Sequence, residues 1–174
     1  MKRQRGFNII EMVVVIAIIG LLLTIGVPSF QTWTQNLQIR AGAEGVLAGL
    51  NIAKNEAVRR NVNVELTLSN NTGWDVHTAA VPGTSLRMRD PNEGSVNTTS
   101  VVLPTGTTTV TFNGMGRVVP TNSDGTAPMA QLDFDNPMIV NVSDRRKLRI
   151  VINTGGGMRL CDPSVPSTDN RACP

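Results

Sequence analysis

Residues 6–28 read GFNIIEMVVVIAIIGLLLTIGVP, and this stretch decides how the rest of the sequence is interpreted. The 21 residues of 7–27 are apolar apart from Asn8, Glu11 and Thr24. With a rise of about 1.5 Å per residue, a helix of this length is about 31 Å long, which matches the roughly 30 Å hydrocarbon thickness of a bilayer. The stretch therefore predicts a membrane-spanning helix.

The residues before this stretch are basic. Lys2, Arg3 and Arg5 precede Gly6, and positive residues hold their end of a spanning helix in the cytoplasm, so the remainder of the chain is expected on the other side. An ordinary secretory signal starts in the same way. Against that alternative, the apolar run is longer than a usual signal core, and no A-x-A-like cleavage site follows it.

A carboxylate inside the apolar run is the feature that a plain membrane anchor does not explain. Near the bilayer centre it costs about 2.5 to 3.5 kcal/mol, so Glu11 needs a partner. Gly6, Phe7, Glu11, the apolar run and Pro28 together resemble the class III signal of type IV pilins. The resemblance implies that a prepilin peptidase cuts between Gly6 and Phe7, that Phe7 is N-methylated, and that Glu11 acts in assembly. The Glu11 carboxylate of one chain would then pair with the new amino terminus of another chain.

Composition excludes much of enzyme chemistry. The 174 residues, enough for one domain, include one histidine, His77, and two cysteines. One copy therefore cannot assemble a histidine-rich or four-cysteine zinc site, or a two-histidine catalytic centre. The net charge of +3 disappears on cleavage, because residues 1–6 carry three of the 16 Lys and Arg and leave 13 against 13 Asp and Glu. We expect no catalysis, no cofactor, no metal and no global basic field for nucleic acid.

The helical pattern continues beyond Pro28. Apolar residues recur every three or four positions and predict an amphipathic helix laid on a sheet, with a stripe that includes Ala43, Val46, Leu50, Ala53 and Ala57. A helix over residues 7–60 would be about 80 Å long, more than one domain spans. Pro28 is expected to kink or loosen this helix, because it lacks a backbone donor.

From residue 62 the period changes to two, with Glu65 among the polar positions. Short alternating segments between Gly, Pro and Asn turns predict antiparallel strands. They lie at 62–69, 74–77, 86–89, 101–103, 107–112, 117–119, 132–134, 138–142 and 148–152. One long helix followed by strands predicts an α+β domain in which the helix packs on one face of an antiparallel sheet.

Parts of this region carry a second resemblance. Residues 51–60, 73–76, 147–150 and 159–163 are similar to the GspH/FimT (FimT/FimU) class of minor pilins and pseudopilins. The resemblance implies a type IV pilin fold. Its expected parts are a cleaved leader at 1–6, a membrane and assembly helix at 7–28, the amphipathic half of the helix at 29–60, and a periplasmic β-rich body at 61–174.

Cys161 and Cys173 enclose eleven residues rich in Pro, Ser and Asp. An exported chain reaches an oxidising compartment, so we expect a disulfide that ties down the C-terminal tail. Two free thiols or a redox pair are the alternative.

Basic residues gather in the last part of the sequence: Arg145, Arg146, Lys147, Arg149, Arg159 and Arg171. From residue 143 onward the chain holds only three acids, and the local excess of positive charge could attract phosphates. The alternative is a solvated hairpin edge, where charge blocks sheet-to-sheet aggregation. Some FimT-like proteins bind DNA through a Gly-Arg-x-Arg motif. The matching residues here are 156–159, with Gly157 in place of the first arginine, and no aromatic residues interleave with the basic ones for stacking.

Two further patterns have simpler interpretations. Asp75 and His77 lie two residues apart on one strand and share a face, which predicts a surface ion pair or a half-buried polar strand rather than an acid/base pair. Residues 155–157 are all glycine but lack the lysine and the following helix of a phosphate loop, so we interpret them as a hairpin turn.

The sequence as a whole predicts a minor type IV pilin that initiates a pilus or lies at its tip, by resemblance, in pilus biogenesis, motility or adhesion. It would be held in the bacterial inner membrane with its body in the periplasm and would then enter a pilus at the cell surface. The expected partners are the prepilin peptidase, the pilus assembly platform, and other minor and major pilins. One alternative is a pseudopilin of a type II secretion system, which the paired cysteines weakly disfavour. The other is a DNA-binding minor pilin for natural transformation.

Overall fold

The computed structural model describes residues 8–80 and 83–174. Gly6 and Phe7, where cleavage and methylation are predicted, lie outside the described residues. The chain forms two compact units, one up to Thr34 and one over Gln35–Pro174. One helix, α1 (Ile9–Arg60), supplies residues to both units, and each unit is described by itself.

The first unit contains the apolar part of α1. This helix is long and apolar enough to cross a membrane, and its apolar window is not buried against any other part of the described chain. Pro28 lies inside α1, which stays helical on both sides of it. Pro28 therefore does not interrupt the helix, and the predicted kink remains a prediction.

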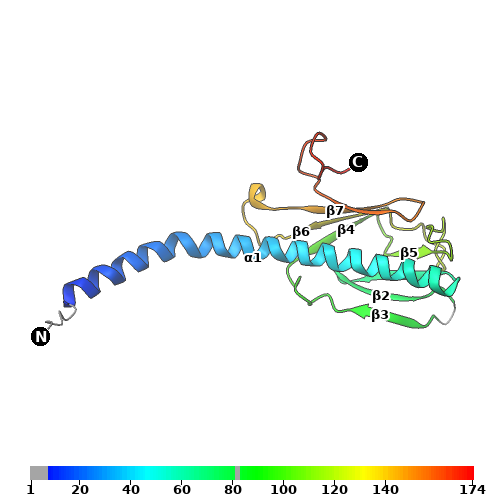
Figure 1. Ribbon diagram of the computed structural model, residues 1–174, viewed down its shortest axis with the longest axis horizontal. Coiled ribbons are helices and arrows are strands. Elements are labelled where there is room, and N and C mark those ends of the chain that lie inside the picture. Colours follow the sequence, from blue (N-terminus) through cyan, green and yellow to red (C-terminus); the bar gives the residue numbers. More distant parts are fainter. Residues whose placement is uncertain (1–7, 81–82) are drawn as a thin grey trace, which may run out of the picture. The chain divides into compact units, whose positions relative to one another are not determined.

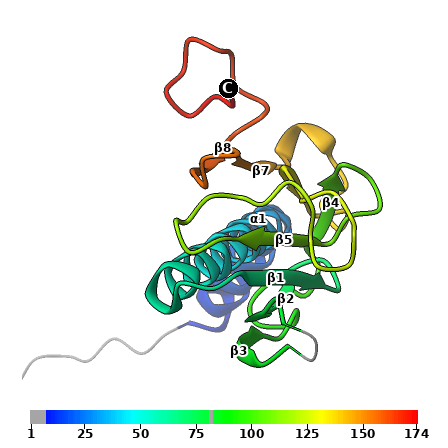
Figure 2. The same cartoon turned by 90° about the vertical axis from the view of Figure 1, so that its right-hand side faces the viewer.

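The second unit contains the rest of α1 and two antiparallel sheets (Figure 1). The first sheet has the order β3-β2-β1-β5 and the second the order β4-β6-β7-β8. The strands are β1 (Val64–Ser69), β2 (Gly73–Thr78), β3 (Ser85–Arg89), β4 (Thr99–Leu103), β5 (Thr109–Phe112), β6 (Gln131–Asp135), β7 (Leu148–Ile152) and β8 (Met158–Cys161), with a short 3-10 turn, η1 (Val142–Asp144), before β7. Figure 2 shows β5, β1, β2 and β3 following one another beside α1, with β7 and β8 in the neighbouring layer. The α+β class predicted from the sequence is confirmed, but the strands divide into two sheets rather than one.

The core forms between α1 and both sheets. One stripe of α1 is fully buried, and it comprises Ile39, Ala43, Val46, Leu50, Ala53 and Ala57. These side chains belong to one apolar cluster with Leu66 and Phe112 of the first sheet and with Phe134 and Ile150 of the second. The small alanines of the stripe let the helix approach the strands closely. The helix therefore holds the two sheets together through their inner faces.

Two predicted strands are wrong. Residues 138–142 form a loop and the start of η1, because the Asn136-Pro137 pair is a turn signal. The Asn136 side chain accepts a bond from the backbone N–H of Met138 at 3.0 Å and closes that turn. Residues 117–119 make only an isolated bridge, Phe112 with Val118, since this segment leaves a turn at Gly114–Gly116.

Candidate functional site

The apolar segment with its single carboxylate is the first candidate site. Glu11 lies in the first turn of α1, where its backbone N–H donates to the Asn8 carbonyl at 3.0 Å. Most large apolar side chains around it are more than half exposed, including Ile10 and Met12. In the described residues Glu11 forms no ion pair. The predicted partner for this carboxylate belongs to another chain, so its role stays a prediction.

The basic cluster is the second candidate site, and the structure places acidic residues of β6 against it. Arg145 Nη1 lies 3.3 Å and Lys147 Nζ lies 3.1 Å from Asp135 Oδ2. Burial raises the pKa of Asp135, but the hydrogen bond from Lys147 and the charges of Lys147 and Arg145 outweigh it and lower the pKa below its ordinary value. Asp135 therefore stays ionised at neutral pH and neutralises part of the cluster.

Arg149 and Asp133 form a second pair in the same cluster. The two residues face each other across β6 and β7 in the antiparallel register. Arg149 Nε lies 2.5 Å from Asp133 Oδ1, and Nη2 lies 3.0 Å from Oδ2, so both carboxylate oxygens are engaged. Such a two-bond contact fixes the guanidinium in one orientation.

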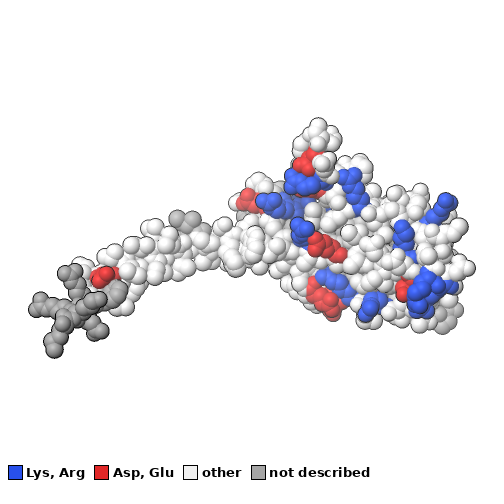
Figure 3. Space-filling view, viewed as in Figure 1, with Lys and Arg blue, Asp and Glu red and all other residues white. Residues whose placement is uncertain are grey.

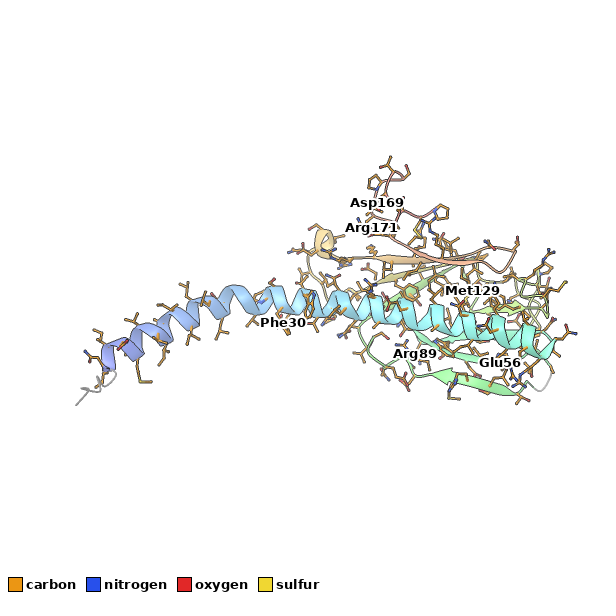
Figure 4. The ribbon with its side chains drawn as sticks, viewed as in Figure 1. Phe30, Glu56, Arg89, Met129, Asp169 and Arg171 are labelled. Atoms are coloured by element: carbon orange, nitrogen blue, oxygen red, sulfur yellow. A yellow bond between two sulfur atoms is a disulfide. The ribbon has the colours of Figure 1, made fainter. Side chains whose placement is uncertain are left out.

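Two further arginines of the basic cluster, Arg159 on β8 and Arg171 in the C-terminal tail, have partners in the tail. Arg159 donates from Nη2 to the Asn170 carbonyl at 2.8 Å, and Arg171 Nη2 lies 2.8 Å from Asp169 Oδ2. The hydrogen bond from the Arg171 side chain lowers the pKa of Asp169 to about 2. Figure 4 shows Asp169 and Arg171 together in this segment. The tail is closed by a disulfide between Cys161 and Cys173.

Arg146 differs from the other members of the cluster. Its backbone N–H donates to Asn36 Oδ1 at 2.9 Å, while its exposed guanidinium has no hydrogen-bond or ion-pair partner among the residues that the structure describes.

The six basic residues of the cluster are accompanied by five acids, Asp133, Asp135, Asp144, Asp162 and Asp169. On the face seen in Figure 3, carboxylates likewise lie among the basic side chains. Sequence reasoning missed Asp133 and Asp135 as partners of the cluster. Their signal in the sequence is the alternation of polar Gln131, Asp133 and Asp135 with buried residues along β6, which places all three on one face of the strand.

The structure does not bring Asp75 and His77 together. Asp75 Oδ1 accepts a bond from Ser85 Oγ at 2.6 Å, whereas His77 Nε2 lies 3.1 Å from Thr67 Oγ1. Of the two interpretations predicted from the sequence, the surface ion pair does not form, whereas the half-buried polar strand is confirmed, because both side chains are half-buried on β2. Each polar side chain has its own partner on a neighbouring strand.

The glycine triplet is the turn between β7 and β8, as the sequence indicated. Gly156 adopts a φ of +77° and approaches the Gly116 carbonyl so closely that no side chain would fit there. Lys54 Nζ of α1 donates to the Gly156 carbonyl at 2.8 Å. The turn is therefore attached to α1 and lies against the 113–117 loop. Its Gly156 carbonyl accepts a hydrogen bond from a lysine ammonium group, which is the opposite of a phosphate loop, where backbone N–H groups bind an anion.

Glu65 is a structural residue that the alternating pattern missed. It is 2% exposed on β1, although the pattern places it among the polar positions. Its carboxylate accepts bonds from Thr111 Oγ1 at 2.8 Å, from the Ser123 backbone N–H at 2.8 Å and from Ser123 Oγ at 2.7 Å. The carboxylate thus fastens the 113–127 segment over the outer face of β1 and β5.

Comparison with solved structures identifies the class of fold. The chain resembles the type IV minor pilin FimU of Pseudomonas aeruginosa in two crystal forms, each at 18% identity. The first match covers 79% of this chain and 95% of FimU with a TM-score of 0.55, and the second has a TM-score of 0.51. The fold is therefore the type IV pilin fold.

Comparison with protein families identifies the family. The model described as "Type II transport protein GspH" matches residues 42–156, and the model described as "Prokaryotic N-terminal methylation motif" matches residues 1–27. The chain belongs to the GspH family. It is a pilin-like structural subunit and not an enzyme, and its amino-terminal motif and apolar helix fit a membrane-anchored pilin.

Curated relatives agree with this family. Two fimbrial proteins of Pseudomonas aeruginosa are 32% identical over 76 residues, which make up 44% of this chain. The chain spans about half the length of these relatives, 49%. A fimbrial protein of Moraxella nonliquefaciens is 24% identical over 148 residues, which cover 83% of this chain and 94% of that protein.

Proposed function

We propose that this chain is a minor subunit of a type IV pilus and acts in the initiation or at the tip of the filament. The observation that carries the proposal is the exposed apolar surface of α1 around Glu11. A surface of this kind needs lipid or other apolar helices around it. The methylation motif and the likeness to FimU support the same role.

The proposed path begins in the inner membrane. A prepilin peptidase removes residues 1–6, Phe7 becomes N-methylated, and the apolar helix holds the chain with its body in the periplasm. The pilus assembly platform then moves the chain into a filament, where α1 packs against the helices of other minor and major pilins.

Glu11 has a specific part in this step. In lipid an unpaired carboxylate is costly, and a positively charged amino terminus of a neighbouring helix satisfies it. The pairing gives a reason for the chain to leave the membrane for the filament, and it fixes the stagger between neighbouring helices.

A pair of variants tests this function in a strain that lacks the native gene. Glu11→Gln removes the charge in the apolar segment, and Glu44→Gln removes a charge from the exposed part of α1 in the body, where Arg40 is the ion-pair partner of Glu44 among the described residues. Tagged chains are then measured in the inner membrane and in sheared filaments. We expect both variants to be processed and inserted, with Glu44→Gln entering filaments and Glu11→Gln remaining in the membrane. Normal incorporation of Glu11→Gln, or absence of the unmodified chain from sheared filaments, would contradict the proposal.

The family description favours one second candidate, a pseudopilin of a type II secretion system, because the matching family model is named for a type II transport protein. The same fold and anchor serve both roles. Deleting the gene separates them: loss of surface pili with normal protein secretion supports the pilus subunit, and loss of secretion with normal piliation supports the pseudopilin.

A further inference from the structure

The loop between β6 and β7, residues 136–147, exposes an unusual amount of apolar surface. Met138, Val140 and Val142 are 62%, 88% and 64% exposed. Single exposed apolar side chains are ordinary on a soluble surface, but three of them within five residues of one loop are unusual. We refer to residues 136–147 as the β6–β7 loop.

The β6–β7 loop is attached to the start of α1 in the second unit. Asn36 Nδ2 donates to the Asp144 carbonyl at 2.9 Å, and Asn36 Oδ1 accepts from the Arg146 backbone N–H at 2.9 Å. Asn136 Nδ2 donates to Gln35 Oε1 at 2.8 Å. Figure 1 shows η1 of this loop beside α1. These bonds attach both ends of the β6–β7 loop to Gln35 and Asn36 of α1.

Only a short stretch of sequence separates these residues from the predicted membrane segment. Gln35 follows Val27, the last residue of the apolar run, by eight residues. As helix, this distance is about 12 Å. Polar headgroups extend the bilayer beyond its hydrocarbon core by roughly 5 to 8 Å on each side. Phe30 and Trp33 lie in between, with ring centroids 5.6 Å apart, and aromatic residues are enriched at headgroup level.

The charge of the β6–β7 loop suits a lipid surface. It carries Arg145, Arg146 and Lys147 against Asp144. Arg145 and Lys147 share Asp135, but the exposed Arg146 guanidinium has no partner among the described residues. Exposed apolar side chains can enter the boundary between headgroups and acyl chains, and a free basic side chain is attracted to anionic headgroups.

We propose that the β6–β7 loop docks on the phospholipid surface while the subunit is held in the membrane. Met138, Val140 and Val142 enter the boundary between headgroups and acyl chains, and Arg146 binds lipid phosphates. This inference rests on the membrane anchoring in the proposed function, but it does not depend on whether the final assembly is a pilus or a pseudopilus.

Lipid quenching of a fluorescent label tests the docking. The full chain carries Val140→Cys labelled with NBD, without reduction of the Cys161–Cys173 disulfide, and is reconstituted into vesicles of phosphatidylethanolamine and phosphatidylglycerol. The matched control is Met115→Cys, because Met115 is 75% exposed in the loop whose Gly114 lies against Asn61, at the other end of α1. Some vesicles contain lipid with a doxyl quencher near the headgroup.

We expect at least twofold quenching at position 140 and none at position 115. Arg146→Gln should lower the quenching at position 140 in phosphatidylglycerol vesicles toward its level in neutral phosphatidylcholine vesicles. Because the exposed Arg146 guanidinium makes no hydrogen bond or ion pair with the described residues, this variant should keep the fold.

The outcomes separate the two levels of the proposal. Failure of the chain to float with vesicles contradicts the anchoring itself. Flotation with equal, weak quenching at positions 140 and 115 overturns only the docking. Protection of the label at position 140 in sheared filaments, without quenching in vesicles, would overturn it as well, because the loop would then be a contact between subunits.

Discussion

Substitution of Gly49 by alanine tests how closely α1 approaches the first sheet. A Cβ atom at Gly49 would lie 2.6 Å from Cε2 of Trp74 and 3.0 Å from Cδ1 of Leu66. The indole of Trp74 is 5% exposed, and its Nε1 donates to the Gly45 carbonyl at 2.9 Å. The ring has little room to move away, so the helix or the strand must shift.

The magnitude follows from a comparison with Gly45→Ala on the same helix. Both substitutions gain about 1 kcal/mol of helix propensity, and this term cancels between them. At Gly45 the new Cβ meets the guanidinium of Arg89, which is the far end of a flexible side chain. Moving it weakens its bond to the Thr72 carbonyl and its contacts with the exposed Glu93, of which the ion pair contributes little, at a cost of about 1 kcal/mol. At Gly49 overpacking against a fixed ring costs about 1 to 3 kcal/mol.

We therefore expect Gly49→Ala to be up to about 2 kcal/mol less stable than Gly45→Ala, with a Tm lower by several degrees at about 2 to 4 °C per kcal/mol. The assay is thermal unfolding of the full chain in detergent micelles, followed by tryptophan emission. A Trp33→Phe background leaves Trp74 as the reporter, since the sequence has two tryptophans. Equal Tm values for the two variants, with unchanged Trp74 emission, would refute the close contact.

Three more predictions address the body and the tail. Glu65→Ala should destabilise the body by about 2 kcal/mol in thermal unfolding, because the buried Thr111 hydroxyl and the two donors of Ser123 all lose their carboxylate acceptor; an unchanged Tm would contradict this. Cys161→Ser with Cys173→Ser should cost roughly 3 kcal/mol by loop-closure entropy, measured by urea unfolding, and a loss below about 0.5 kcal/mol would show that the tail closes without the bond. The Asp169 carboxyl should titrate near pH 2 by NMR and should move toward its ordinary value of 3.8 in Arg171→Gln. Because the folded pKa is lowered, the stabilising contribution is present above the unfolded pKa and is lost as the pH falls through about 2. A titration near 3.8 in the unmodified chain would show that the pair does not form in solution.

The helix could be predicted from the sequence because its signal is local. Ala43, Val46, Leu50, Ala53 and Ala57 follow the helical period, and the structure buries all of them. Their spacing reports directly which face meets the sheets. By contrast, the division of the strands into two sheets depends on pairings between distant segments, such as β1 with β5, for which a single sequence gives no signal.

The polar side of β1 shows why alternation fails at Glu65. The alternation separates the face toward α1 from the opposite face, and Glu65 does lie opposite the buried Leu66. A two-residue period cannot report that the 113–127 segment folds back and covers that opposite face. The buried carboxylate then depends on Thr111 and Ser123, which lie 46 and 58 residues away in the sequence. A short loop that covers a sheet face therefore converts a position that looks solvated into a core position.

The basic cluster shows the same limit for a functional prediction. Counted along the chain, six basic residues accompany three acids from residue 143 onward. The antiparallel register of β6 and β7 brings Asp133 and Asp135 into the cluster, so Arg145, Lys147 and Arg149 already have carboxylate partners. A protein gains affinity for DNA when its basic side chains neutralise phosphates and release the counterions bound there. A basic side chain bound to a carboxylate must give up that contact first, so its gain from a phosphate is smaller. Among the described residues, Arg159 and Arg146 have no carboxylate partner, and only the Arg159 guanidinium has a hydrogen bond, to the Asn170 carbonyl. Two such arginines are few for a DNA interface, which needs several phosphate contacts, whereas the free Arg146 guanidinium suits contact with a lipid headgroup.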